Sequence, residues 1–265
     1  MLYNVWTVII FAYLVGSFLN VIIYRLPIML QFKNPSEVKI FNLALPRSHC
    51  VKCQKQLAWW HNIPVLSYGF LSGKCYYCHA KISWRYLVVE IAYIAMALLC
   101  YFCSNGFIEF TAYILFTSLI LVIAAIDLET MLIPDILNYL LMWSGMLINS
   151  KELICSLKES VFGCVFGYLI LWGAYKLILY TTKKHGFGYG DFKLLAALGA
   201  WLGVFKLFNV LFLASIIGLL YALITCKKMH EPLPFGPALC SSGFLILLFP
   251  HQFNLLHWGY LLFGT

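Results

Sequence analysis

Repeated apolar runs of about 20 residues, nearly free of charged side chains, limit most strongly how this chain can fold, because an α-helix of that length crosses a bilayer. Only 11% of the residues are charged, against about a quarter in an average soluble domain. A membrane β-barrel would instead show short segments of alternating polarity. The sequence therefore predicts an all-α polytopic membrane protein.

We expect about eight transmembrane helices, of which the sixth and the eighth are short. Their expected ranges are Val5–Tyr24, Leu87–Cys103, Phe110–Ile126, Leu132–Ile148, Val161–Tyr180, Phe192–Phe205, Leu207–Cys226 and Ala238–Pro250. No basic residue precedes the first run, and no clear small-residue cleavage site follows it. We therefore expect the first run to be retained as a helix and not removed as a signal peptide.

One long polar segment, Arg25–Tyr86, separates the first apolar run from the second. It is rich in the turn-forming residues proline and glycine and contains no run that could cross a bilayer. The sequence thus predicts three parts: a first transmembrane helix over 1–24, an insert over 25–86, and a transmembrane core over 87–265.

Basic residues set the expected orientation of the helices. Half of the eighteen Lys and Arg residues lie between Arg25 and Arg85, and cytoplasmic loops of membrane proteins are enriched in these residues. The insert is therefore expected in the cytoplasm and the N-terminus outside. Counting spans from there places four more lysines inside, namely Lys183, Lys184, Lys227 and Lys228. The net charge of +8 is thus explained by topology, and we expect the lipid bilayer, not nucleic acid, as the partner.

Four cysteines in the insert form two Cys-x-x-Cys pairs, Cys50 with Cys53 and Cys75 with Cys78. Two such pairs can supply four thiolates to one tetrahedral zinc, a closed structural site with no open position for catalysis. A cytoplasmic insert is kept reduced, which disfavours disulfides. The alternative is a pair of redox motifs, or disulfides if the topology is inverted. The other cysteines lie in or beside apolar runs and are expected to be small core residues: Cys100, Cys103, Cys155, Cys164, Cys226 and Cys240.

Acidic residues are few, and two groups of them border apolar runs. An ionisable side chain at membrane depth is costly and marks a candidate functional site. Asp127 ends the run Phe110–Ile126, and Asp191 precedes the run that starts at Phe192. Structural roles are an alternative to a functional one for the acidic residues of both groups. Asp135 follows Pro134 at an expected helix start, where an acid suits the helix dipole, and Glu129 suits a solvated turn. Asp191 itself could cap the helix expected to begin at Phe192.

Two carboxyl groups on different helices at one membrane depth could meet. Close together they cannot both ionise cheaply, so one stays protonated and the two titrate as a coupled pair. This is the arrangement of aspartic proteases: the ionised acid draws a proton from water, and the protonated acid polarises the peptide carbonyl. No Ser-His-Asp set and no His-Glu-x-x-His motif competes for this role in the sequence.

A glycine-rich loop, with Gly186, Gly188 and Gly190, precedes Asp191. Glycine permits left-handed backbone angles and close approach of a ligand, and helix capping does not require three of them. The spacing is not a dinucleotide fingerprint, since no strand precedes it. A helical substrate hides its carbonyls in internal hydrogen bonds. We therefore hypothesise that Gly188 and Gly190 offer backbone groups to an unwound substrate strand.

Seven motifs, taken together and in order, resemble the bacterial type IV prepilin leader peptidases that are also N-methyltransferases, which are membrane aspartic peptidases with a GxGD motif. The motifs are GSFLNVIIYRLP, PRSHCVKC, IPVLSYGFLSGKCYYC, ISWRYLVVE, IDLETMLIPD, GYGDFKLLAALGAWLG and PFGPAL. The resemblance implies a cytoplasmic-membrane enzyme with its active site facing the cytoplasm. Such enzymes cut the basic leader of prepilins and pseudopilins after a glycine, in pilus assembly or type II secretion. It places the two catalytic aspartates at Asp127 and Asp191.

The resemblance also implies a second activity, methylation of the new N-terminal residue, usually phenylalanine, with S-adenosylmethionine as donor. The sequence shows no donor-binding motif, and we assign no residue to that site. Asn20 and Glu90 could line a site or bond two helices together. Two departures stand out: Val51 replaces a proline of the first cysteine pair, and Leu87 replaces the proline of Arg-Tyr-Pro. Neither touches the acids.

Two other classes of protein remain as alternatives. A proton-coupled transporter would also use paired carboxylates and glycine breaks, but its halves would resemble each other and its acids would lie near mid-span. A redox membrane protein would need the cysteine pairs on the outer face, which the distribution of basic residues does not predict.

Overall fold

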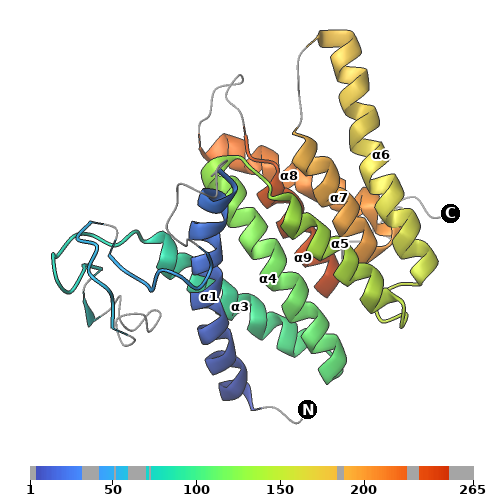
Figure 1. Ribbon diagram of the computed structural model, residues 1–265. Helices are drawn as coiled ribbons and strands as arrows, with labels where there is room; N and C mark the ends of the chain where they lie inside the picture. The colour runs from blue at the N-terminus through green and yellow to red at the C-terminus, as the bar shows by residue number, and fades with distance from the viewer. Residues whose placement is uncertain are drawn as a thin grey trace. The chain divides into compact units, whose positions relative to one another are not determined.

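The computed structural model describes residues 4–31, 42–50, 52–58, 70–71, 73–183, 188–225 and 233–250. Within them β pairing is confined to two isolated bridges, and the all-α fold expected from the sequence is confirmed. The helices are α1 (Val5–Gln31), α3 (Arg85–Cys103), α4 (Phe107–Thr130), α5 (Asp135–Asn149), α6 (Leu157–Thr182), α7 (Tyr189–Leu202), α8 (Leu207–Ile224) and α9 (Gly236–Leu248), with a short 3-10 turn, Val204–Lys206, before α8 (Figure 1).

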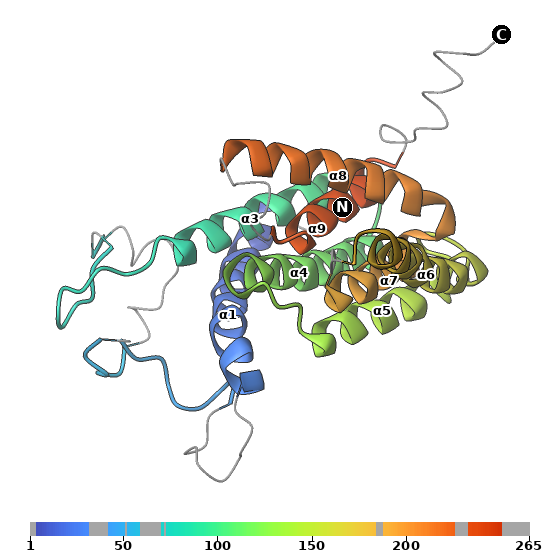
Figure 2. The same ribbon diagram turned by 90° about the horizontal axis from the view of Figure 1, so that it is seen from above.

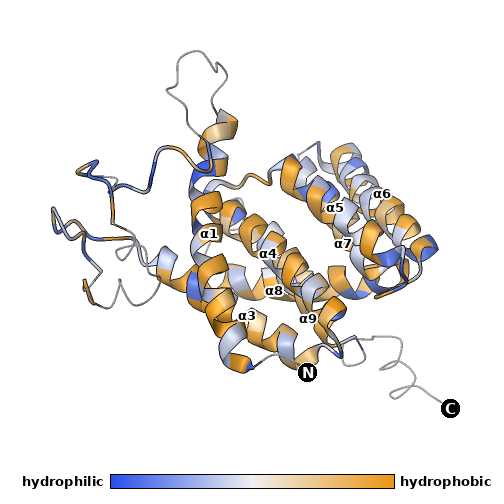
Figure 3. Ribbon diagram, turned by 60° about the horizontal axis from the view of Figure 1, so that its bottom comes forward, coloured by the Kyte–Doolittle hydropathy of each residue, from blue (hydrophilic) through white to orange (hydrophobic). Residues whose placement is uncertain are grey.

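Among the described residues, five stretches are long and apolar enough to cross a membrane: α1, α3, α4, α6 and Val204–Ile224, which contains α8. Figure 3 shows hydrophobic residues along most of the length of the helices. Large apolar side chains such as Trp6, Phe102 and Leu177 are exposed along these helices, as expected where lipid covers them. The chain is therefore a polytopic membrane protein.

Three helices, α5, α7 and α9, are too short to cross a bilayer alone. They have 15, 14 and 13 residues, so they extend about 20 to 23 Å, against a hydrocarbon core of about 30 Å. Short helices were expected for the sixth and eighth spans, whereas the fourth span was expected to start at Leu132. That start is wrong by three residues, because Met131 has a left-handed backbone with φ 53° and Pro134 is extended.

The chain divides into two compact units, residues 1–122 and 123–265, with the boundary inside α4. In the first unit α1 packs against α3. Helix α1 continues past its expected end at Tyr24, because the buried Arg25 finds acceptors in the insert. Its guanidinium donates to the carbonyls of Asn42, Leu43 and Pro46 at 2.8, 3.3 and 2.6 Å. The three-part division expected from the sequence stays a prediction.

The second unit is built around α7, which lies beside both α5 and α6 (Figures 1 and 2). Glycines allow α6 and α7 to pack backbone against backbone. A Cβ on Gly167 would lie 2.7 Å from the carbonyl oxygen of Leu195, and a Cβ on Gly163 would overlap the carbonyl oxygen of Gly199. Small residues at one-turn spacing are the usual means of such close approach in membranes.

Side-chain hydrogen bonds fix the C-terminal end of α7. The Asn149 amide donates to the carbonyls of Ala200 and Trp201 at 2.9 and 3.0 Å, and the Ser160 hydroxyl donates to Ala200 as well. The Trp201 indole in turn donates to the carbonyl of Leu141 at 2.6 Å. Carbonyls that a helix end leaves without partners are thereby satisfied. The N-terminal end of α7, which carries Asp191, is held differently.

The glycine packing predicts a position-specific cost of adding one methyl group. Gly163→Ala should lower the free energy of unfolding by about 1–3 kcal/mol, the usual cost of overpacking, because α6 and α7 must separate. A lower thermal unfolding midpoint in detergent would report it. Gly173→Ala on the same helix is the control, since no atom lies within 4 Å of its added Cβ, and it should be neutral or stabilising. Equal midpoints for the two variants would contradict this packing.

Candidate functional site

Asp127 lies near the C-terminal end of α4 and is only 4% exposed. Its Oδ2 accepts a hydrogen bond of 3.0 Å from the backbone N–H of Gly236, the first residue of α9. The start of a helix has N–H groups without helical partners and a partial positive charge, so it suits a carboxylate. A Cβ on Gly236 would lie 2.6 Å from Oδ2. Glycine is therefore required at this position for the N–H to reach the acid.

Asp191 is the third residue of α7 and is 8% exposed. Its Oδ2 accepts a hydrogen bond of 3.3 Å from the N–H of Gly188, and its buried Oδ1 has no hydrogen-bond partner among the described residues. The expected helix start at Phe192 is wrong, because Gly188 has an extended backbone and α7 begins directly after it, at Tyr189. Asp191 is thus not the residue that precedes the helix. It lies in the first turn and reaches back to Gly188.

The structure brings the two acids to one place in the second unit. Their carboxyl groups are close enough to interact electrostatically, and the buried Cys240 of α9 interacts with both. Ile133, just before α5, contacts both sides of the site. It lies 2.9 Å from an ideal Cβ on Gly190 and 3.1 Å from one on Gly236. The ends of four helices therefore meet here, while the catalytic role of the acids stays a prediction.

The other two candidate acids are placed differently. Asp135 begins α5, and its carboxylate forms an exposed ion pair with Lys193 of α7, with N–O distances of 2.7 and 2.8 Å. This supports a structural role for Asp135, although such an exposed pair contributes at most about 1 kcal/mol. Glu129 is exposed in the last turn of α4, so its expected place in a turn after the helix is wrong.

In the described part of the glycine loop, glycine is needed because a side chain would not fit, and not because the backbone takes angles that only glycine allows. Gly188 has φ −79° and Gly190 is helical, so the left-handed angles expected here are absent at both. A Cβ on Gly188 would lie 3.3 Å from Asp191 Oδ2. The N–H and the carbonyl of Gly188 both bond to Asp191, whereas Gly190 lies in the first turn, where N–H groups lack helical partners. Gly186 lies outside the described residues.

The four insert cysteines converge in the first unit. The sulfur atoms of Cys50, Cys53, Cys75 and Cys78 all lie within 4.8 Å of one another, and two of them, those of Cys50 and Cys78, are 3.7 Å apart. The two pairs have the same local fold. The N–H of Cys50 donates to the carbonyl of Lys55, and that of Cys75 to Ala80. A left-handed residue follows each pair, Gln54 or His79.

Comparison with known proteins identifies the family. The family model "Bacterial Peptidase A24 N-terminal domain" matches residues 10–104, and the model "Type IV leader peptidase family" matches residues 114–223. The protein of Stutzerimonas stutzeri named "Prepilin leader peptidase/N-methyltransferase" is 39% identical over 92% of this chain and 90% of its own length. Proteins of the same name from Dichelobacter nodosus and Pseudomonas aeruginosa are also 39% identical, over 95% and 92% of this chain and 93% and 90% of theirs. The chain belongs to the type IV leader peptidase family.

This membership confirms the resemblance found in the sequence and replaces the transporter and redox alternatives. No solved structure matches the chain. The first family model covers the four cysteines, and the second covers Asp127 and Asp191. Gly236 lies beyond both matched ranges, although its N–H bonds directly to Asp127.

The cysteine cluster of this leader peptidase family member fits a tetrahedral metal. Sulfur atoms about 2.3 Å from a tetrahedral zinc would lie about 3.8 Å apart, close to the observed spacing. The N–H of Cys53 lowers the pKa of the Cys50 thiol to about 6, so this thiol is ionised at neutral pH and ready to act as a ligand. The N–H of Ala80 lowers the pKa of Cys78, but burial and the neighbouring thiols outweigh it and raise that pKa to about 11. Deprotonation of the set therefore begins at Cys50.

Asn20 and Glu90, the two polar residues left open by the sequence, bond α1 to α3. The Asn20 amide donates to the carbonyl of Tyr86 at 3.0 Å and to Glu90 Oε1 at 3.3 Å. This supports the structural interpretation of the pair.

The contacts of Gly236, Ile133 and Cys240 around the two acids were not predicted from the sequence. Of these, only Gly236 carried a signal, since Pro237 after it favours a helix start.

Loss of one thiolate should empty the metal site. Cys75→Ser is expected to reduce the metal content of the purified protein to near zero, because the remaining three ligands leave the tetrahedral site incomplete. Elemental mass spectrometry measures it. Cys100→Ser is the matched control, as Cys100 is buried in α3 and bonds to Thr117, and it should retain the metal. Metal-free, fully active wild-type protein would show that the cluster is not a metal centre.

Proposed function

We propose that this chain cuts the leader peptide from type IV prepilins and pseudopilins after a glycine and then methylates the new N-terminal residue, usually phenylalanine. Family membership and the names of the similar proteins support an enzyme of this kind. The observation that carries the peptidase mechanism is the meeting of Asp127 and Asp191, with Asp191 Oδ1 left without a partner.

The surroundings of the two acids suggest a role for each. A hydrogen bond from a backbone N–H favours the ionised form of a carboxyl group, and an oxygen without donors favours the neutral form. Each acid accepts one such bond, but the bond to Asp127 is shorter, 3.0 Å against 3.3 Å for Asp191, and Asp191 also has a buried oxygen without a donor among the described residues. Asp127, held by Gly236, is proposed as the ionised acid that draws a proton from the attacking water. Asp191 is proposed as the protonated acid that polarises the scissile carbonyl and later protonates the leaving amine. Gly190 is proposed to offer its backbone to the unwound substrate strand.

The active site is proposed to face the cytoplasm. The basic insert precedes α3, and each spanning helix reverses the side of the membrane on which the chain emerges. Helix α3 therefore leads outward from the insert and α4 leads back, so that Asp127 near the end of α4 returns to the side of the insert. The rule that basic loops are cytoplasmic then assigns this side, in the inner membrane of a bacterium.

Two groups absent from a bare chain complete the proposal. Zinc is proposed as the metal of Cys50, Cys53, Cys75 and Cys78, in a structural role that joins the two cysteine pairs of the insert. S-adenosylmethionine is proposed as the methyl donor, and it supplies the transferred methyl group when bound. No described residue is assigned to the donor.

Removing either acid should stop cleavage. Asp127→Asn and Asp191→Asn are each expected to lower kcat by about 100-fold or more, the contribution of one general acid or base, in a mass-spectrometric assay with a synthetic peptide that contains a leader and an apolar segment. Glu152→Gln, an exposed acid at the opposite end of α5, serves as the control. Both Asn variants should still methylate a peptide without its leader, which verifies folding. Full turnover by either would mean that the wrong acid was chosen.

Gly236 should be required although it carries no functional group. The Cβ of Gly236→Ala would lie 2.6 Å from Asp127 Oδ2, so the carboxyl group must move away. A catalytic group misplaced by about 1 Å lowers the rate by about 100-fold, and we expect a loss of kcat of this order. The same peptide assay measures kcat. The control is Gly218→Ala in α8, whose nearest neighbours to an added Cβ lie at an ordinary 3.8 Å. Unchanged kcat in Gly236→Ala would remove this N–H from the mechanism.

A further inference from the structure

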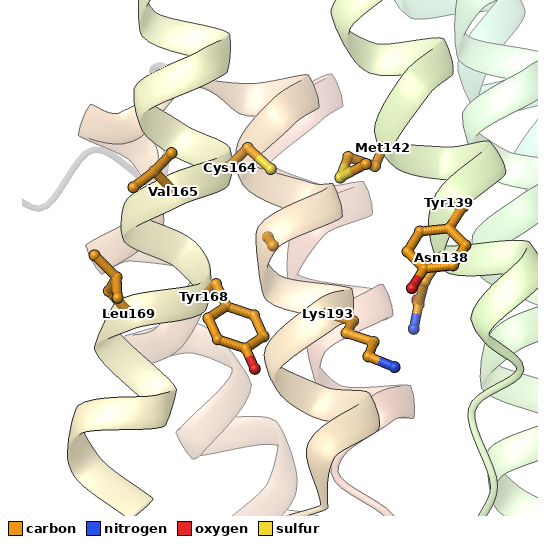
Figure 4. A pocket seen from close by; sticks show the side chains of 9 residues that line it. Asn138, Tyr139, Met142, Cys164, Val165, Tyr168, Leu169 and Lys193 are labelled. Atoms are coloured by element: carbon orange, nitrogen blue, oxygen red, sulfur yellow. The ribbon is translucent and has the colours of Figure 1, made fainter.

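A groove of about 360 Å³ lies between α5, α6 and α7 in the second unit (Figure 4). Its walls are mainly apolar, and Tyr139, Val165 and Leu169 are exposed at its mouth. Lys193 and Ala196 of α7 also line it. Figure 4 shows Asn138, Lys193 and Tyr168 with their polar atoms toward the end of the groove nearest the start of α7. The groove is therefore apolar along its length and polar at the end closest to Asp191.

Asn138 is the unusual residue of this groove. Its side chain is 1% exposed, and both amide atoms, Nδ2 and Oδ1, lack hydrogen-bond partners in the part of the chain that the structure describes. Asn149 on the same helix is equally buried, but its amide makes hydrogen bonds through both atoms. Buried amides are nearly always hydrogen-bonded, and leaving one unpaired is costly. The geometry of Asn138 fits a ligand that brings one acceptor and one donor side by side.

We propose that this groove binds an uncoiled apolar stretch of peptide, with the Asn138 amide paired to one of its peptide bonds. The proposal rests on the proposed function, in which the peptide is the substrate segment that follows the scissile bond. A peptide bond supplies one carbonyl acceptor and one N–H donor, which Asn138 requires. The apolar walls accept the side chains of that segment. The volume suits a few residues and not a whole helix, which is about 10 Å across.

Two other ligands fit less well. A lipid acyl chain has no hydrogen-bonding groups, and the ester carbonyl of a lipid could accept from Nδ2 but donate nothing to Oδ1. S-adenosylmethionine carries a sulfonium and a charged amino-acid end, and burying charge between apolar walls is costly. The one charged side chain that lines the groove, Lys193, already pairs with Asp135.

The position of the groove suits an uncoiled strand. Asp191 and Lys193 are two residues apart on α7, and residues at that spacing do not share a helix face. The groove and the acids therefore lie around different faces of α7. A chain that occupies both must pass the start of this helix, where Gly190 lies. A strand can follow this bend, whereas a straight helix cannot.

The test replaces Asn138 with an apolar residue of similar size. Asn138→Leu should raise KM for the synthetic leader peptide by about tenfold, the loss expected for a hydrogen-bonded pair, with kcat nearly unchanged. Its thermal unfolding midpoint should stay equal or rise, since no hydrogen bond within the protein is lost. Asn149→Leu, the matched control, should lower the midpoint and leave KM unchanged. An unchanged KM in Asn138→Leu would overturn the proposal, as would a lower midpoint without a change in KM.

A second measurement does not depend on cleavage. A photo-reactive p-benzoylphenylalanine in place of Tyr139, in the Asp191→Asn background, should label the peptide at residues that follow the cleavage site, and excess S-adenosylmethionine should not compete. Labelling of lipid alone, or loss of labelling with S-adenosylmethionine, would overturn the proposal. If the variant with p-benzoylphenylalanine at position 139 labels the peptide but wild-type protein never cuts it, the peptidase function fails and the groove survives. If it cuts the peptide and neither KM nor labelling involves the groove, only the groove fails.

Discussion

The hydrogen bond from the N–H of Gly236 to Asp127 is the interaction around which the site is organised. It joins the end of α4 to the start of α9 and places a buried acid where a helix offers unpaired donors. Asp191 follows the same principle in the first turn of α7. The positive ends of short helices can thus stabilise charge in this site. Because α5, α7 and α9 are shorter than the bilayer is thick, their N-terminal ends can meet at the acids.

The opposite end of α7 is held rigidly, which gives the acids a fixed base. Gly163 and Gly167 bring α6 against α7, and Asn149, Ser160 and Trp201 tie the last turn of α7 to its neighbours. Precise placement of catalytic groups depends on such support from outside the site. The acid end, by contrast, is built from turns and leaves Asp191 Oδ1 free for a substrate or water. The proposed groove beside α7 would extend this site along the membrane-embedded part of a peptide.

Much of the fold follows from the sequence, because apolar runs of bilayer length leave few alternatives. Each expected span overlaps a helix, and the two cysteine pairs meet as their spacing predicted. The errors occur where backbone geometry decides: Met131 and Pro134 delay α5, and Gly188 allows α7 to begin early. The partner of Asp127 was hidden because a bond from a backbone N–H depends on which helix ends meet, and no residue type encodes that. The unpaired amide of Asn138 was hidden for the same reason, since an asparagine in an apolar run gives no sign of whether it is bonded.

The account depends on two carboxyl groups that hold one proton between them. Infrared spectroscopy of protein labelled with ¹³C-carboxyl aspartate, in lipid at neutral pH, observes protonated and ionised carboxyl groups separately. Comparison with Asp127→Asn and Asp191→Asn assigns the bands. The account predicts one protonated and one ionised carboxyl group in the wild-type pair, with a changed signal of the remaining acid in each variant. Two fully ionised groups, each unaffected by removal of the other, would contradict it.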